Sequence, residues 1–194
     1  PHWTWPGREG QSTPVHCYTS FNTVELFLNG ESLGRRCKRV KLMMGTYRLV
    51  WPDVRYAPGE LKAVAYDNEG NPVAETFVRT AGQAAAIELT LDRNSVSADG
   101  DDMAFATVRI VDADGNLCPR ADSLVQFRID GPAEIAAVGN GDATSLESFL
   151  ADRRKAFNGL CMVYLRSVEG SCGPITLHAE SEGLKAVRAV FECA

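Results

Sequence analysis

The sequence lacks the patterns that mark several function classes. No apolar run approaches the roughly 18 residues of a membrane-spanning helix, so membrane insertion is not expected. No basic stripe is present and the net charge is −5 at pH 7, which argues against nucleic acid as a partner. The serine-hydrolase signature Gly-x-Ser-x-Gly does not occur, and the three histidines give catalysis little to use.

Cysteine spacing excludes the common metal and redox motifs. The six cysteines contain no Cys-x-x-Cys pair, so we expect no metal site and no cofactor. The simpler interpretation is that most are free and pack as small hydrophobic or surface side chains. The alternative is a disulfide framework in an exported protein. It is best tested at Cys161 and Cys172, which each lie beside a strand-like run.

What the sequence does have is apolar residues that alternate with polar ones, the pattern of half-buried strands. Val24, Leu26 and Leu28 share one face, and Asn29-Gly30 predicts a type I′ hairpin turn before a returning strand. Many short strands separated by turns predict an all-β fold of antiparallel sandwiches. Further strands are expected in residues 47–54, 60–67, 73–80, 85–91, 103–112, 123–130, 133–139, 160–168, 174–181 and 185–192.

Charge divides the chain into two parts. Residues 1–82 carry a net charge of +2 and residues 83–194 carry −7, which suggests two units that meet near "RTAGQAAAIEL". A weak internal repeat suggests the same kind of hairpin in each part. The stretches "AVAYDNEGNPV" and "VRIVDADGNLC" both place Asp-x-acid-Gly-Asn between two strand-like runs.

Three loop-like stretches invite functional interpretations but have simpler ones. "DADGN" (residues 112–116) resembles the start of a calcium loop, yet it lacks the later ligands of an EF-hand, and turn chemistry explains it with fewer assumptions. "VGNGDATS" (residues 138–145) lacks the Gly-Lys-Ser/Thr of a phosphate-binding loop and is expected to be a wide loop. Residues 144–157 are expected to form a long loop with at most one helical turn, in which "DRRKAF" is a solvated basic cluster.

The first ten residues, "PHWTWPGREG", gather aromatic side chains before any strand-like pattern begins. His2, Trp3 and Trp5 stand together here in a chain with three tryptophans. Two interpretations are open for them. They are aromatic residues of a core, or they form the lip of a binding site where an aromatic face stacks on a ligand.

Residues 1–36, "PHWTWPGREGQSTPVHCYTSFNTVELFLNGESLGRR", resemble the region just after the catalytic barrel of bacterial glycoside hydrolase family 2 enzymes, in the β-galactosidase group. The resemblance continues through residues 56–93, 98–149 and 154–167, and thus covers nearly the whole chain. It implies two tandem immunoglobulin-like antiparallel β-sandwich domains. Residues 1–82 would be the accessory sandwich that follows the barrel, and residues 83–194 a C-terminal immunoglobulin-like domain.

The resemblance also implies a function. The family's general acid/base and nucleophile glutamates act by a retaining mechanism on the barrel, which would precede Pro1, so no residue of this chain inherits a catalytic role. The chain would brace the barrel of the same polypeptide and shape the access of a galactoside. His2, Trp3 and Trp5 become candidates for the substrate rim. Enzymes of this group are often exported, which implies a periplasmic or secreted location.

Two alternatives stay open. The first is that the chain is an autonomous carbohydrate-binding module, although an aromatic content of 8% offers few rings for stacking on sugars. The second is that it is an adhesin-type immunoglobulin-like spacer, since "ADGDD" and "VDADGN" resemble bacterial surface repeats. If residues 1–10 form a junction to a barrel, they should be more mobile than the strands, and a buried Trp3 would count against that idea.

Overall fold

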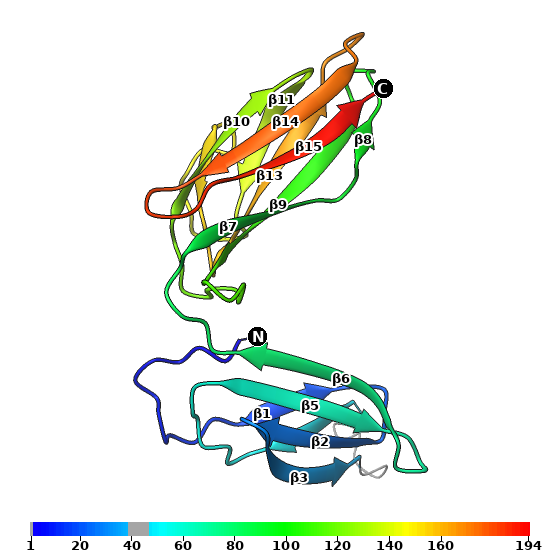
Figure 1. Cartoon of the computed structure of the whole chain (residues 1–194), viewed down its shortest axis with the longest axis vertical. Helices are drawn as coiled ribbons and strands as arrows, with labels where there is room; N and C mark the ends of the chain where they lie inside the picture. The colour runs from blue at the N-terminus through cyan, green and yellow to red at the C-terminus, as the bar shows by residue number, and fades with distance from the viewer. Residues whose placement is uncertain (1, 39–46) are drawn as a thin grey trace. The chain divides into compact units, whose positions relative to one another are not determined.

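The computed structural model describes residues 2–38 and 47–194, and the chain divides into two compact units, Pro1–Thr80 and Ala81–Ala194 (Figure 1). The described residues form strands, turns and loops and contain no helix, so none of them belongs to a helix that could cross a membrane. The predicted all-β fold of antiparallel sheets is therefore confirmed. We describe each unit separately below as unit 1 and unit 2.

Unit 1 is built from two antiparallel sheets of unequal width. Its strands are β1 (Val15–Tyr18), β2 (Thr23–Leu28), β3 (Glu31–Cys37), β4 (Arg48–Trp51), β5 (Glu60–Tyr66) and β6 (Pro72–Arg79). The wider sheet has the order β3-β2-β5-β6, and the narrower one pairs β1 with β4. Because a two-stranded layer cannot cover a four-stranded one, nearly all of β6 is exposed.

The predicted hairpin in residues 23–36 is confirmed. Asn29 and Gly30 both have positive φ, 52° and 84°, as a type I′ turn requires, and β2 and β3 pair on either side of them. Val24 and Leu26 point into the core of unit 1, each 1% exposed. That core consists of Trp3, Val24, Leu26, Leu49, Trp51, Val54, Tyr56, Leu61 and Ala65.

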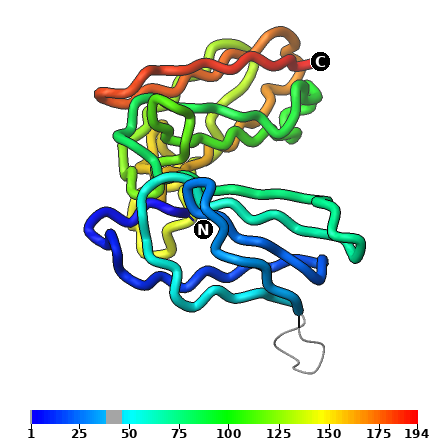
Figure 2. Tube along the Cα trace, turned by 60° about the horizontal axis from the view of Figure 1, so that its bottom comes forward, coloured from blue at the N-terminus to red at the C-terminus, as the bar shows by residue number. Residues whose placement is uncertain are grey.

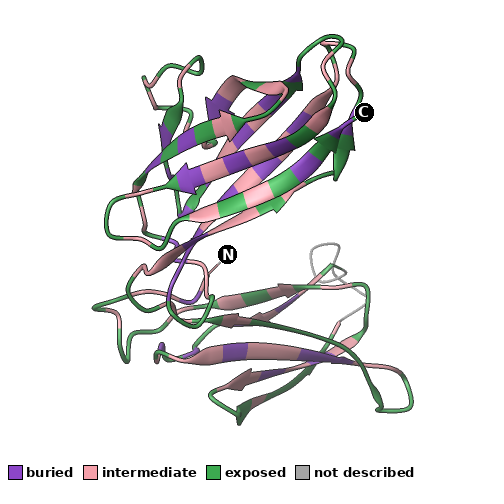
Figure 3. Cartoon of the chain, turned by 45° about the horizontal axis from the view of Figure 1, so that its top comes forward, coloured by how far each residue is buried: buried purple, intermediate pink, exposed green. Residues whose placement is uncertain are grey.

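Unit 2 is a sandwich of two sheets with the orders β11-β13-β9-β7 and β12-β10-β14-β15-β8. Its strands are β7 (Ala86–Leu91), β8 (Ser95–Val96), β9 (Met103–Val111), β10 (Leu124–Asp130), β11 (Ala133–Gly139), β12 (Arg153–Lys155), β13 (Leu160–Ser167), β14 (Gly173–Glu180) and β15 (Val187–Cys193). Buried and exposed residues alternate along most of these strands (Figure 3). Val108, Val125 and Leu177, for example, are fully buried between the two sheets.

The two Asp-x-acid-Gly-Asn stretches form the same kind of turn, one in each unit. Asp67 accepts the backbone N–H groups two and four residues further on at 2.9 and 2.8 Å, and Asp112 does so at 3.0 and 2.8 Å. Gly70 and Gly115 supply the positive φ of each turn, 89° and 80°. The turn interpretation is thus confirmed. Among the described residues, no three His, Cys, Asp or Glu side chains are grouped so that they could hold a metal ion.

The basic stretch "DRRKAF" is not the solvated loop that the sequence suggests. Residues 153–155 form β12, which pairs with β10, and the side chain of Arg154 is 1% exposed. Period-two alternation turns Arg154 inward, where Nη1 and Nη2 each donate a hydrogen bond and Nε has no partner. The stretch before it, residues 140–152, is a loop without a helical turn. The Ser145 hydroxyl there accepts the backbone N–H of Glu147, a local bond that competes with a helix.

All six cysteines carry free thiols, so no disulfide joins Cys161 to Cys172. Cys161 is buried in the core of unit 2, whereas Cys172 is exposed. Burial raises the pKa of the Cys161 thiol to about 12, and this thiol is therefore protonated at neutral pH.

Candidate functional site

The N-terminal segment, residues 2–14, wraps around the end of unit 1 where β5 begins and β6 ends (dark blue in Figure 2). Trp3 fixes this segment from inside the core. Its Nε1 donates to the carbonyl of Ala57 at 2.9 Å, and its ring meets that of Tyr56 edge-on with centroids 5.1 Å apart. Its own carbonyl accepts the Thr80 hydroxyl at 2.5 Å. Three contacts to three separate residues thus anchor the segment.

Trp3 is a core residue, since its side chain is 3% exposed. A tryptophan buried this deeply cannot offer its face to a ligand on the surface of unit 1. Of the two interpretations open for Trp3, this burial favours the core residue over the lip of a binding site. It also counts against a loosely attached N-terminal segment, because a mobile segment would leave the core without one of its two tryptophans.

His2 and Trp5 lie side by side at the surface and are both half-buried. Their ring centroids are 4.2 Å apart and the planes are inclined by 34°. Two backbone groups fix the pair: the N–H of Thr4 donates to Nδ1 of His2 at 3.1 Å, and the N–H of Trp5 donates to the Tyr56 hydroxyl at 3.0 Å. The structure therefore brings these two candidates together as one aromatic surface.

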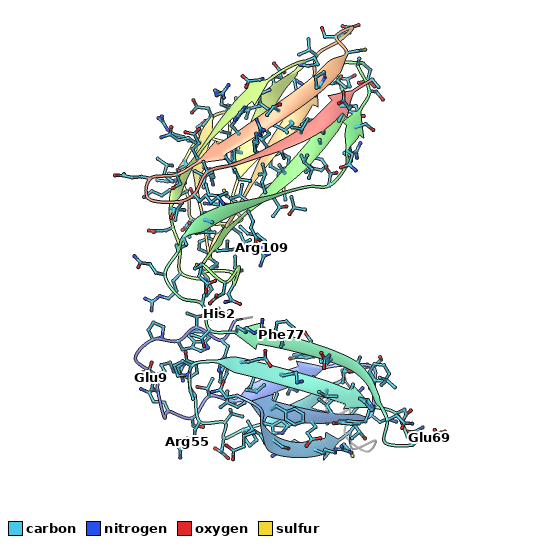
Figure 4. All side chains as sticks on the ribbon, viewed as in Figure 1. His2, Glu9, Arg55, Glu69, Phe77 and Arg109 are labelled. Carbon is cyan, nitrogen blue, oxygen red and sulfur yellow. The ribbon has the colours of Figure 1, made fainter. Side chains whose placement is uncertain are left out.

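This aromatic surface borders a groove of about 440 Å³ in unit 1. The groove lies between β1 and the β5–β6 side of the wider sheet, where the narrower sheet leaves the apolar face uncovered. Its floor is apolar and includes Leu26, Leu61 and Ala63. Figure 4 places His2 and Phe77 on the β6 side of the unit.

A second hollow of about 130 Å³ extends the groove along β1. The two hollows share Cys17, Tyr18, Ala63 and Thr76, so they form one continuous depression. Tyr18, 69% exposed, and Phe77, 49% exposed, also line the groove. Burial raises the pKa of the Cys17 thiol, and nearby Lys38 opposes that effect only in part, so the thiol stays neutral at pH 7.

The groove offers aromatic faces and a few hydrogen-bonding side chains. Thr76 and His16 line it beside the aromatic rings, whereas the hydroxyl of Thr13, which also borders it, is buried. Among the described lining residues, Glu75 supplies the one carboxylate, whereas retaining glycoside hydrolysis uses two carboxylates about 5–5.5 Å apart. This combination suits the binding of a ring with one apolar face and several hydroxyls.

The sequence pointed to His2 and Trp5 but not to Tyr18 and Phe77. Their positions depend on the pairing of β1 with β4 and of β5 with β6, which joins residues far apart in the chain. One signal was present: "VAETFVRT" puts the aromatic residue Phe77 between Glu75 and Arg79 on the outward face of the strand. The remaining histidines behave as the sequence suggested. His16 is exposed, and Nε2 of His178 lies 2.9 Å from a carboxylate oxygen of Asp130 in unit 2.

Two protein families match the chain. The family described as glycoside hydrolase family 2 C-terminal domain 5 matches residues 87–190, and a domain of unknown function (DUF4982) matches residues 10–74. Neither match extends across both units. Together they cover most of the chain.

Individual relatives match over nearly the full chain. A β-galactosidase of Bacteroides ovatus, BoGH2A, is 42% identical over 95% of this chain. A solved glycosyl hydrolase family 2 structure from Bacteroides cellulosilyticus is 38% identical over 100% of the chain with a TM-score of 0.90. A β-glycosidase structure from Bacteroides vulgatus is 31% identical over 99% with a TM-score of 0.91. The chain spans 21% of the first protein and 24% of each of the other two.

Proposed function

Because this chain belongs to the glycoside hydrolase family 2 C-terminal domains, matched over residues 87–190, we propose that it is the accessory segment of a retaining β-galactosidase-like enzyme. In this proposal hydrolysis takes place on a catalytic barrel elsewhere in the polypeptide, and the two units brace that barrel. The observation that carries the proposal is the extent of the relatives. Proteins with glycosidase names match 95–100% of this chain, and the matched region makes up about a fifth to a quarter of their own length.

The groove of unit 1 supports a second part of the proposal, the shaping of substrate access. His2 and Trp5 form a fixed aromatic surface beside the groove, and sugar rings stack on such surfaces through their apolar faces. Trp3 acts as a positioning residue, since it holds the segment that carries the other two. We therefore assign the rim role to His2 and Trp5.

The reading frame that contains this chain tests the first part of the proposal, which is the accessory role beside a catalytic barrel. A catalytic barrel with two suitably placed glutamates ahead of residue 1 is the expected finding, and a reading frame without one would overturn the proposal. A direct assay accompanies this observation. The purified 194-residue chain should release no nitrophenol from a nitrophenyl β-galactoside above the rate in buffer, and turnover by a clean preparation would contradict the accessory role.

The same groove favours a second candidate function, an autonomous carbohydrate-binding module. Tyr18 and Phe77 border the groove as well and are 69% and 49% exposed, so further aromatic side chains lie at its edge. A module needs no catalytic part nearby, so it should bind sugar as the isolated chain. The accessory role does not require the isolated chain to bind sugar.

Calorimetry with galactose and galacto-oligosaccharides separates the two functions. A module should bind with a measurable heat, and Trp5→Ala should weaken that binding by about tenfold, or about 1.4 kcal/mol. The matched control is Tyr47→Ala, since Tyr47 is 71% exposed in the same unit and does not line the groove. No heat with any of these sugars would exclude them as ligands of an independent module.

A further inference from the structure

The loop of residues 140–152 in unit 2 exposes large apolar side chains to an unusual degree. Leu146 is 100% exposed, Leu150 83% and Phe149 64%. We call these three residues the loop patch. Because the core of unit 2 is complete without them, they add nothing to its burial. Exposed apolar patches with polar surroundings mark interaction surfaces in soluble proteins.

The loop patch stands on a rigid base. The buried guanidinium of Arg154 donates through Nη1 to the carbonyl of Glu147 and through Nη2 to the side-chain oxygen of Asn140, both at 3.0 Å. It also lies 5.2 Å from the ring centre of Phe149. The amide of Asn140 in turn donates to the carbonyl of Lys155 at 2.9 Å. One charged side chain thus ties the two ends of the loop and its middle together.

Further bonds fix the loop at its edges. The N–H of Val138 donates to the carbonyl of Phe149 at 2.9 Å, and the N–H of Phe127 donates to that of Asp152 at 2.7 Å. The carboxylate of Glu147 accepts the N–H of Lys155 at 3.3 Å. Nε of Arg154 has no hydrogen-bond partner and lies 3.7 Å from a carboxylate oxygen of Glu147. Because a buried guanidinium is costly, the hydrogen bonds that Nη1 and Nη2 do make favour the loop shape that provides them. A loop with a fixed shape loses little entropy when a partner binds.

A hollow beside the patch adds a complementary feature. It has a volume of about 530 Å³, and Phe149, Leu160, Met162 and Tyr164 line it together with Arg154. Leu160 is itself 37% exposed, so the apolar surface continues from the loop to β13. Protruding side chains next to a hollow allow knobs and pockets to interlock, as they do at the centre of tight interfaces.

We propose that the loop patch is the surface through which unit 2 docks onto the catalytic part of the same polypeptide. The inference rests on the proposed function and names the surface that performs the bracing. An apolar centre on a preformed loop fits a permanent interface, which resembles a core divided between two parts. A partner of sufficient size is expected in the same polypeptide, since about three quarters of the length of the relatives lies outside the region that this chain matches.

A photo-crosslinking experiment in the full-length polypeptide tests the proposal. Benzoylphenylalanine replaces Phe149 in one preparation and Val190 in another, since Val190 is 56% exposed on β15 of the same unit. We expect position 149 to cross-link to peptides of the catalytic part and position 190 not to do so. Adding Leu146→Asp should reduce the cross-link yield at position 149 by about tenfold, because docking would bury a carboxylate.

The outcomes separate the two proposals. If the reading frame encodes no catalytic part, the proposed function fails. If it encodes one and position 149 cross-links only within residues 81–194, or only between two copies of the chain, the docking inference alone is overturned. The isolated chain provides a further measurement by sedimentation. A dimer that Leu146→Asp converts to monomer would identify a second copy as the occupant and would contradict the inference.

Discussion

The two units achieve burial in different ways. Among the described residues, the core of unit 1 has nine buried members, and three of them are the large rings of Trp3, Trp51 and Tyr56. The core of unit 2 has nineteen, and Phe127 and Phe191 are its only rings. A core made of a few large rings depends on each of them, whereas one made of many small side chains distributes its stability. The narrow second layer of unit 1 also leaves a groove open.

The largest expected effect follows from the ring-based core of unit 1. Trp3→Ala should lower the free energy of unfolding of unit 1 by about 3–5 kcal/mol, because it leaves a large cavity and removes the bond to Ala57. Urea unfolding followed by circular dichroism, with NMR signals to assign each unit, measures the change. Unit 2 should keep its midpoint. Trp5→Ala, a control at a half-buried position, should cost much less.

A loss below about 1 kcal/mol for Trp3→Ala would contradict this comparison, since it would place the N-terminal segment outside the cooperative core of unit 1. Hydrogen exchange gives an independent measurement. The backbone N–H of Trp5, bonded to the Tyr56 hydroxyl, should exchange slowly. Fast exchange throughout residues 2–10 would restore the mobile segment that the sequence suggested.

The two Asp-x-acid-Gly-Asn turns provide the next comparison. Asp112 is 5% exposed and also accepts the N–H of Gly82 at 2.7 Å, whereas Asp67 is only half-buried. Asp112→Ala should therefore destabilise unit 2 by about 1–3 kcal/mol, because it leaves buried N–H donors without acceptors. Asp67→Ala, the matched control, should have a far smaller effect on unit 1. Equal effects of the two substitutions would show that burial does not distinguish the turns.

The charge of Asp112 adds a pH dependence to unit 2. Burial alone would raise its pKa, but hydrogen bonds from Gly82 and Asn116 outweigh burial and the pKa is lowered. A lowered pKa contributes stability above the unfolded value of about 3.9, and this is lost as the pH falls through the folded value. Between pH 7 and pH 3, the urea midpoint of unit 2 should thus fall further in the natural chain than in Asp112→Asn. If the urea midpoint fell equally with pH in the natural chain and in Asp112→Asn, the carboxylate would not have this role.

The smallest effect concerns reactivity and leaves stability unchanged. Each unit has one exposed thiol, Cys37 in unit 1 and Cys172 in unit 2, and these should react first with a maleimide at pH 7. Cys161 should stay unmodified until the chain unfolds, because it is buried and protonated. Mass spectrometry of the labelled peptides tests both statements. Early labelling of Cys161 would indicate that the sandwich of unit 2 opens readily.

Much of the fold was predictable because strand periodicity is local. The alternation in residues 103–112 identified β9, and Asn29-Gly30 identified the hairpin turn. The strand β12 was missed because hydropathy counts Arg154 as a surface residue, and only its hydrogen bonds explain its burial. Thr144 and Ser145 suggested a cap for a short helical turn, but the Ser145 hydroxyl accepts the N–H of Glu147 within a loop.

The candidate site was predictable in part for a similar reason. His2 and Trp5 stand close together in the sequence and in space, so their clustering was visible from the start. Tyr18 and Phe77 reach the groove through the arrangement of β1 and β6, which no local pattern records. The burial of Trp3 depends on Ala57 and Thr80, more than 50 residues away.

The exposed outer edge of β6 also determines how easily a strand of another molecule could pair with unit 1. Pro72 at its start lacks the N–H that a neighbouring strand would require, and Glu75 presents a charge paired with Lys62 at 3.7 Å. Arg79 at its end is paired with Glu60 at 2.7 Å. A strand from another molecule would have to strip water from these charges before it could pair. The charged border of β6 therefore works against fibre-like association through this edge of unit 1.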